Sequence, residues 1–180
     1  MAISEVHSIR EMILWQHAKI MSSCDGFGKS NTGHITRKYK QLKDHEIDWL
    51  MSAERIMHEN GRPGKCAYCG RHTSVAESFL IPITRGGPGG KENQVLACGL
   101  CRLGKGDKRL YEWYGLQNSD KIPVSTEAKY LVLLHDLHTK RGTIEESRIS
   151  RLCANCDMEP LCPEKQTFSP YCLEGCFMKK

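Results

Sequence analysis

The chain has 180 residues, of which 39% are hydrophobic, and its formal net charge is +5 at pH 7. A chain of this length forms one ordinary domain or two small ones. No apolar run approaches the roughly 18 residues that a membrane-spanning helix needs, and the first residues lack the cleavage-site pattern of a signal peptide. We therefore expect a cytoplasmic protein without membrane contact, and the modest positive charge suits a phosphate-bearing partner.

Residues 1–60 are predicted to form a helical segment, because apolar side chains recur there at helical spacing. The recurring positions are Ile9, Met12, Ile13 and Ile20 in a first stretch, and Tyr39, Leu42, Ile47 and Leu50 in a second. The stretch CDGFGKSNTGH between them holds three glycines and is predicted to be a loop. Cys24 has no obvious partner, so we expect it to be a buried apolar residue.

Residues 65–117 hold two close pairs of cysteines and are predicted to form a compact module. The stretch SVAESFLIPIT has the composition of a strand and is followed by the turn RGGPGG. After Cys101, the apolar positions Leu110, Trp113 and Tyr114 predict a short helix that ends at Gly115.

Residues 122–151 are predicted to form C-terminal helices. In the stretch STEAKYLVLLHDLHTKRG, Ser125 is expected to cap the first helix, and Gly142 follows its end. The sequence TIEE that starts at Thr143 has the pattern of a capping box for a further short helix. The remaining segment, 152–180, is rich in cysteine and poor in apolar residues, so it needs a cross-link or a metal to fold.

The spacing of the ten cysteines favours metal binding over disulfides, because pairs separated by two or three residues point two thiolates at one ion. The central pairs predict one closed, tetrahedral structural zinc site, with the ligands Cys66, Cys69, Cys98 and Cys101. In the tail, a second zinc site is predicted with the ligands Cys153, Cys156, Cys172 and Cys176, and with Cys162 as a spare or alternative ligand. An iron–sulfur cluster is the alternative occupant of the tail.

The stretch CAYCG…LIPITRGGPGGKENQVLACGLCRLGKGDKR resembles the HNH endonuclease family, in the subgroup with a structural zinc beside the ββα-metal motif. The resemblance covers about fifty residues, and within them both cysteine pairs, Gly70, Pro82, the Gly86-Gly87 turn, Asn93 and Lys105 fall at the positions of the family pattern. The resemblance implies an α+β protein that is mostly α, in which a small, zinc-stabilised, treble-clef-type ββα core is flanked by helices and followed by the cysteine-rich zinc tail.

The catalytic positions of that family are altered in this sequence. The resemblance places Ser78 and Phe79 where the family has an Asp-His pair, which supplies a metal ligand and the general base. Arg102 stands in the place of the last metal ligand, and only Asn93 is retained. Phenylalanine cannot accept a proton, and serine is a poor ligand for Mg²⁺ beside a carboxylate. We therefore expect weakened or lost nuclease activity, with Mg²⁺ needed only if the protein cuts.

Basic residues around the module predict a contact with the backbone phosphates of nucleic acid. Their fixed positive charge could bind the phosphates at the place where a metal ion neutralises them in the family. The nucleic-acid-binding residues expected are Arg85, Lys91, Arg102, Lys105, Lys108 and Arg109, and the resemblance points to DNA as the partner. Two alternatives stay open. One is an active, metal-dependent endonuclease with non-standard ligands near Asn93, for which Glu77 would face away from Ser78. The other is a non-catalytic zinc assembly factor that binds protein.

Overall fold

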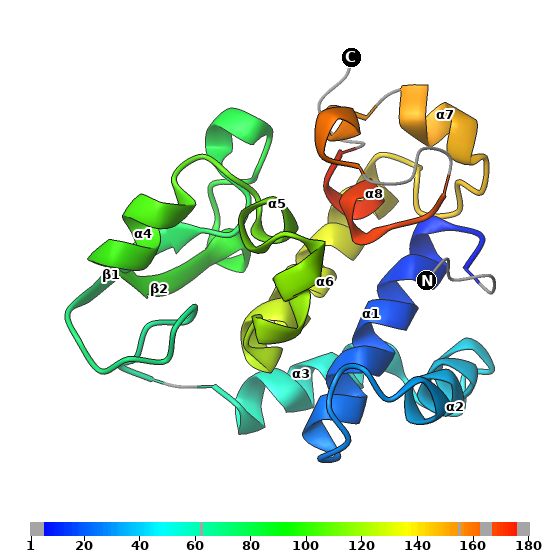
Figure 1. The fold of residues 1–180 in the computed structure, drawn as a ribbon, viewed down its shortest axis with the longest axis horizontal. Coiled ribbons are helices and arrows are strands. Elements are labelled where there is room, and N and C mark those ends of the chain that lie inside the picture. The colour runs from blue at the N-terminus through cyan, green and yellow to red at the C-terminus, as the bar shows by residue number, and fades with distance from the viewer. Residues whose placement is uncertain (1–5, 62, 155, 163–166, 176–180) are drawn as a thin grey trace.

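The computed structural model describes residues 6–61, 63–154, 156–162 and 167–175, and this part of the chain is mostly helical with a small two-stranded antiparallel sheet (Figure 1). The predicted class, α+β with mostly helix, is confirmed at this level. The helices are α1 Ile9–Cys24, α2 Thr32–Lys43, α3 Trp49–Glu59, α4 Gly99–Lys105, α5 Leu110–Tyr114, α6 Val124–Lys140, α7 Ile149–Ala154 and α8 Pro170–Gly175. The strands are β1 Val75–Phe79 and β2 Gln94–Cys98, and short 3-10 helices span Ile83–Arg85, Lys91–Asn93, Leu116–Lys121 and Glu159–Leu161.

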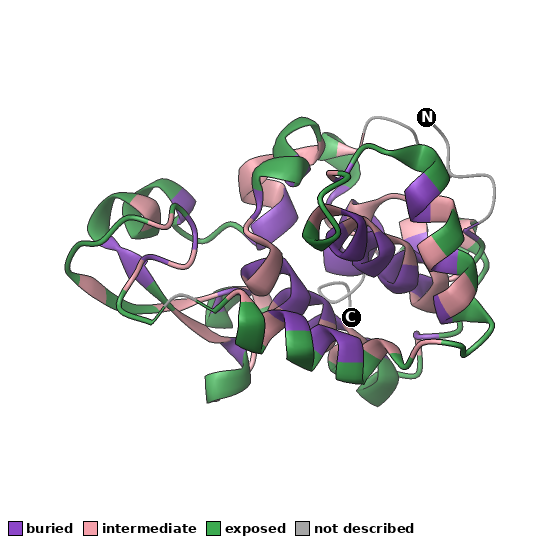
Figure 2. Ribbon diagram, turned by 90° about the horizontal axis from the view of Figure 1, so that it is seen from below, coloured by how far each residue is buried: buried purple, intermediate pink, exposed green. Residues whose placement is uncertain are grey.

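Four helices, α1, α2, α3 and α6, form what we term the helical body. Helix α1 packs against α2 and α6, and α3 packs against α6. The first residues of α1, α2 and α3 follow from local chemistry. The side chains of Ser8, Asn31 and Asp48 each accept a hydrogen bond from the backbone N–H group three residues later. These bonds satisfy N–H donors that have no partner within the first helical turn. Figure 2 shows buried residues along the facing sides of these helices. Apolar burial of this kind is the main stabilising contribution to the body.

Three local predictions are wrong. Helix α6 begins at Val124 after Pro123, and Ser125 does not cap it. Proline has a fixed φ and no backbone N–H to donate inside a helix, so Pro123 is suited to the position just before the helix starts. Thr143 caps no helix either, because its hydroxyl lies 2.8 Å from Nδ1 of His138, and α7 begins only at Ile149. Cys24, expected to be buried, is exposed at the end of α1.

The sheet is a hairpin in which Val75 pairs with Cys98 and Phe79 pairs with Gln94. Helix α4 follows β2 directly and packs across both strands. Between the strands, the chain folds back on itself at Gly87, where a Cβ atom would lie 2.1 Å from the carbonyl oxygen of Ile81. Only glycine fits at that point, so the Gly86-Gly87 turn is needed to bring Asn93 back beside the end of β1.

The C-terminal tail is attached to the rest of the protein by buried polar groups. The Glu174 carboxylate in α8 accepts hydrogen bonds from the backbone N–H groups of Tyr111 and Glu112, in the first turn of α5, and from the Tyr130 hydroxyl in α6. A negative charge at a helix N-terminus is stabilising. Nearby, Lys29 forms a buried ion pair with Glu127 of α6. The Glu174 bonds fix the tail against α5 and against α6 of the helical body, whereas the Lys29 pair joins the segment between α1 and α2 to α6.

No described helix is long and apolar enough to cross a lipid bilayer.

Candidate metal centre and its surroundings

The four central cysteines come together as their spacing predicts. The sulfur atoms of Cys66, Cys69, Cys98 and Cys101 all lie within 4.8 Å of one another, and those of Cys69 and Cys98 are 3.8 Å apart. All four are free thiols. A set of four sulfur donors at these distances could hold one metal ion, and we term it the cysteine cluster. Because Cys66 and Cys69 lie in the turn before β1, Cys98 ends β2 and Cys101 lies in α4, a bound ion would join the start of β1 to the end of β2.

Hydrogen bonds around the cluster favour its thiolate forms. Arg71 donates from Nε to the Cys69 sulfur over 3.4 Å, and this bond lowers the pKa of Cys69 to about 6. The backbone N–H of Cys101 bonds to Cys98 and lowers the pKa of that thiol. Burial acts in the opposite direction on Cys101 and raises its pKa. Thiolates are the species that bind metal, so two of the four ligands are already prepared for an ion.

The turn that carries Cys66 and Cys69 is tied to neighbouring elements. The backbone N–H of Ala67 donates to the carbonyl of Leu96 in β2 at 2.7 Å, and the Thr126 hydroxyl of α6 donates to the carbonyl of Ala67 at 2.8 Å. The Tyr114 hydroxyl of α5 donates to the carbonyl of Tyr68. The cluster is therefore held in place from the sheet, from α5 and from the helical body.

The positions that the family resemblance marks as catalytic have well-defined environments. Asn93 is fully buried, and its side chain accepts from the Ile81 N–H and donates to the carbonyls of Ile81 and Pro88. Both of its amide protons are therefore engaged with backbone. The Ser78 hydroxyl lies 3.4 Å from the Tyr68 hydroxyl. Phe79 is the last residue of β1 and is half-buried.

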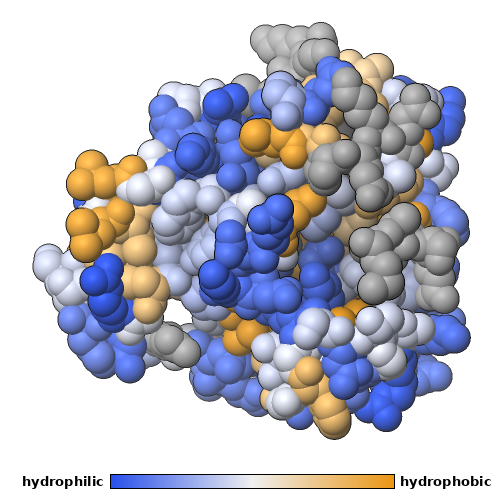
Figure 3. Space-filling model, in the orientation of Figure 1, coloured by the Kyte–Doolittle hydropathy of each residue, from blue (hydrophilic) through white to orange (hydrophobic). Residues whose placement is uncertain are grey.

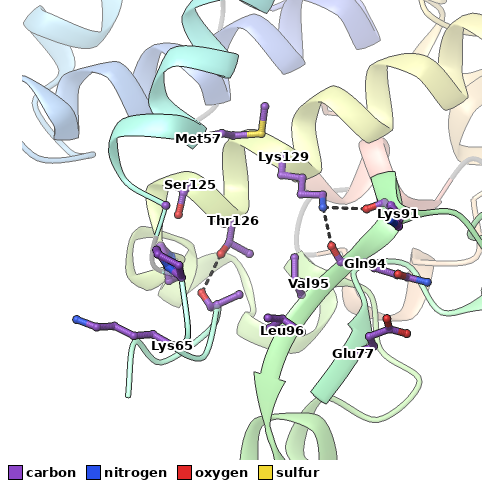
Figure 4. A pocket seen from close by; sticks show the side chains of 14 residues that line it. Met57, Lys65, Glu77, Lys91, Gln94, Val95, Leu96, Ser125, Thr126 and Lys129 are labelled. Carbon is purple, nitrogen blue, oxygen red and sulfur yellow. Dashed lines mark hydrogen bonds between the residues drawn. The ribbon is translucent and has the colours of Figure 1, made fainter. Parts of the chain in front are cut away.

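Glu77 and Ser78 face opposite sides of the sheet, as expected for adjacent strand residues. Glu77 lines an open hollow of about 520 Å³ between β2, the segment after α3 and the start of α6 (Figure 4). Among the described residues, the cysteine cluster is the only group of three or more His, Cys, Asp or Glu side chains at metal-ligand distances. No carboxylate or imidazole cluster gathers beside Asn93 in this part of the chain.

The same hollow shows how α6 is joined to the hairpin. Its floor is mainly apolar and includes Met57, Val95 and Leu96. At its rim, the Lys129 ammonium donates to the carbonyls of Lys91 and Gln94 at 2.9 and 2.6 Å (Figure 4). Lys129 therefore links α6 to the start of β2, because its ammonium group is hydrogen-bonded to two backbone carbonyls there.

The predicted phosphate-contacting residues are not on one surface. Lys91, Arg102 and Lys108 are exposed. Lys91 lines the hollow beside α6, whereas Arg102 lines a different hollow beside α4. Arg85 is partly exposed, and its guanidinium lies 3.7 Å from the Asp157 carboxylate.

Lys105 and Arg109 must be removed from the predicted surface, because only 3% and 1% of their areas are exposed. Arg109 forms an ion pair with Asp157 at 2.9 Å and donates to the carbonyl of Glu174 at 2.7 Å. Burial lowers the pKa of Lys105 to about 8. Lys105 and Arg109 thus turn inward while Lys108 stays exposed, and acidic and carbonyl groups of the tail bind the Arg109 guanidinium. Such buried charges need partners, since an unpaired one is costly.

Sequence reasoning missed the surface that adjoins the cluster on the α4 side. A hollow of about 740 Å³ lies there, and Arg71, His72, Arg102, Leu100 and Leu103 are among its lining residues. No acidic side chain lines it. The positions of the two leucines around Cys101 could have revealed this surface, because a helix that turns Cys101 inward turns Leu100 and Leu103 away from it.

The predicted tail metal site is only partly within the described residues, because Cys176 lies outside them. The thiols of Cys153 and Cys156 form no disulfide. The Met158 N–H donates to the Cys156 sulfur over 3.4 Å, and burial raises the pKa of Cys172 to about 11. A tail zinc or iron–sulfur site therefore stays a prediction.

Comparisons with models of known protein families, with curated protein sequences and with solved structures found no significant match to this chain.

Proposed function

We propose that this chain is a zinc-stabilised protein of the HNH endonuclease type that binds nucleic acid and has weakened or lost nuclease activity. The observation that carries the proposal is the arrangement around the cysteine cluster. The cluster joins the two ends of a hairpin to a helix, and its cysteines follow one another in the order and spacing of that family. Beside it lies an arginine-lined hollow without acidic side chains. Arginine on such a surface suits backbone phosphate.

Zinc is the ion that best fits the cluster. Four sulfur ligands at about 2.3 Å from a tetrahedral ion have edges of about 3.8 Å, which agrees with the 3.8 Å between the sulfurs of Cys69 and Cys98. A site with four protein ligands has no open position, so the ion would be structural. It would leave the cluster with a net charge of about −2, and Arg71 would offset part of it through its bond to Cys69.

Binding without cutting is favoured by the side chains at the former catalytic positions. Phe79 offers no proton acceptor, Arg102 would repel a divalent cation, and the Asn93 amide is bonded to backbone. The partner proposed is DNA, by analogy with the family.

Fluorescence anisotropy with labelled duplex DNA and with structured RNA, at increasing salt, tests the proposal. We expect binding that weakens as salt rises, because phosphate contacts release counterions. Arg102→Ala should lower the salt slope by about one. Absence of binding at low salt would contradict the proposal.

The active-nuclease alternative is tested with plasmid DNA in Mg²⁺ or Mn²⁺, using wild type beside Glu77→Gln and Glu92→Gln, since Glu92 directly precedes Asn93 in the chain. Both glutamates are exposed, so the variants should fold normally. We expect no metal-dependent cutting by any of the three proteins. Cutting by wild type that either variant abolishes would favour the alternative, and cutting equal in all three would show that neither glutamate is required. The assembly-factor alternative gains support if the zinc-loaded protein binds neither nucleic acid.

A further inference from the structure

The four cysteines of the cysteine cluster differ in how far they reach solvent. Cys69 is exposed, Cys101 is half-buried, and Cys66 and Cys98 are buried. Figure 1 places α4, which carries Cys101, at one edge of the molecule, and Figure 3 shows hydrophobic side chains on the outer surface there. Because the cluster lies in this outer part of the protein, a small solute meets the Cys69 thiol before it meets the other three.

Two neighbours of Cys69 suit it to oxidation. The Arg71 guanidinium donates from Nε to the Cys69 sulfur over 3.4 Å and stabilises the thiolate, which is the form of cysteine that attacks an oxidant. The sulfur of the buried Cys98 lies 3.8 Å from that of Cys69. Redox-sensing cysteines share this arrangement, in which an accessible thiolate lies next to a second cysteine that can trap its oxidised form.

We propose that Cys69 is a site of reversible oxidation by hydrogen peroxide, with Cys98 as its resolving cysteine. The Cys69 thiolate attacks one oxygen of the peroxide, the O–O bond breaks, and the products are a sulfenic acid at Cys69 and a hydroxide ion. The Cys98 thiolate then attacks the Cys69 sulfur, displaces the sulfenic oxygen as a second hydroxide and leaves a disulfide. The peroxide has then accepted two electrons from the two thiolates.

This disulfide removes two of the four ligands that the cluster offers to a zinc ion. A sulfur in a disulfide no longer carries the negative charge of a thiolate, and the remaining pair, Cys66 and Cys101, is too small a set for a structural zinc site. Without a shared ion, Cys101 no longer ties α4 to the turn that carries Cys66. The inference rests on the zinc of the proposed function, and it adds a chemical signal that would release that zinc.

The test exposes the zinc-loaded chain to hydrogen peroxide and follows zinc release with a colorimetric indicator. Dimedone traps sulfenic acids, and peptide mass spectrometry locates the trapped cysteine. Cys24 is an internal reference, because it is also exposed but lies outside the cluster, with the Asn60 amide rather than a guanidinium beside its sulfur. We expect zinc release, more dimedone adduct on Cys69 than on Cys24, and, without dimedone, a disulfide between Cys69 and Cys98. A thiol reductant and added zinc should restore the starting protein.

Cys24→Ser is the matched variant, because it leaves all four ligands of the cluster in place. It should release zinc at the wild-type rate, and a much slower release would show that oxidation begins at Cys24 and would overturn the inference. Zinc that stays bound, zinc release without oxidation of Cys69, or a disulfide from Cys69 to a cysteine other than Cys98 would also overturn it.

The same experiment distinguishes a failure of the inference from a failure of the proposed function. Purified protein that holds no zinc in the cluster would overturn both. Zinc release that maps to Cys69 and Cys98, in a protein that binds neither DNA nor RNA, would support the inference and contradict nucleic-acid binding. Nucleic-acid binding by a zinc-loaded protein that resists peroxide would support the proposed function and overturn only the oxidation site.

Discussion

The hairpin module, residues 65–117, and the helical body differ in what holds them together. The body helices share a continuous apolar core, with buried side chains such as Ile9, Met12 and Leu134. The module instead exposes several large apolar side chains, namely Ile83, Leu96, Leu100 and Leu103, and its lobe is mostly exposed or half-buried in Figure 2. The module also buries Leu80, Ile81 and Leu110 in the shared core, but its outer face is held by the cysteine cluster, so we expect a bound ion to matter more there than in the body. This contrast predicts that one substitution can damage either region and spare the other.

The largest effect is expected for Cys98→Ser. Removing one of four thiolates should release the ion, and a structural zinc contributes roughly 10 kcal/mol to folding. The module should become sensitive to protease, while circular dichroism should retain most of the helix signal from the body. Elemental analysis counts the metal, and Cys24→Ser is the control because Cys24 is exposed and outside the cluster. Complete loss of helix signal would show that the two regions are not separable.

A smaller loss of stability is expected for Arg109→Met, which removes a buried contact between the module and the tail. Removing one partner of a buried ion pair typically costs about 3–5 kcal/mol. The substitution leaves the Glu174 carbonyl without its guanidinium donor and leaves Asp157 with only the more distant Arg85 guanidinium. Urea denaturation measures this loss. Arg102→Met is the matched control, since Arg102 is exposed, and it should be within about 0.5 kcal/mol of wild type. Equal losses in the two variants would contradict the burial argument.

The body should respond to pH through His17. Burial lowers the pKa of His17 from 6.5 to about 4, so between these values the unfolded chain binds a proton that the folded state does not. Stability is therefore fully present above about pH 6.5 and falls as the pH drops toward 4, by up to about 3 kcal/mol. His17→Gln should reduce this dependence in urea denaturation, and the remainder should come from His138 of α6, whose pKa burial also lowers to about 4. His58→Gln, at an exposed site, should keep the wild-type slope.

The smallest effect is expected for the cap of α2. Asn31 accepts the His34 N–H at 3.1 Å, and Asn31→Ala should cost about 1 kcal/mol. Asn31→Asp keeps an acceptor and should remain near wild type. Zinc content should be unchanged in both variants, because the cap belongs to the body alone. A change in zinc content would break the proposed independence of the two regions.

The sequence was most informative where structure is decided over a few residues. The close cysteine pairs predicted the cluster, since their spacing is sufficient to aim two thiolates at one point, and periodic apolar residues predicted the helices of the body. Arg109 could not be placed in this way, because its acidic partner Asp157 lies 48 residues further along the chain. Its burial depends on a tertiary contact that no local pattern records. Thr143 matched a capping pattern, but a bond to His138 competes for the same hydroxyl.

The hydrogen bonds of Glu174 also set an order of events during synthesis. Helix α5 is only five residues long, and two N–H groups in its first turn find their acceptor in a residue more than 60 positions downstream. Until the ribosome has added residue 174, that turn can be satisfied only by water, and Arg109 lacks one of its carbonyl acceptors. The second half of the module must therefore wait for the tail before it reaches its final form.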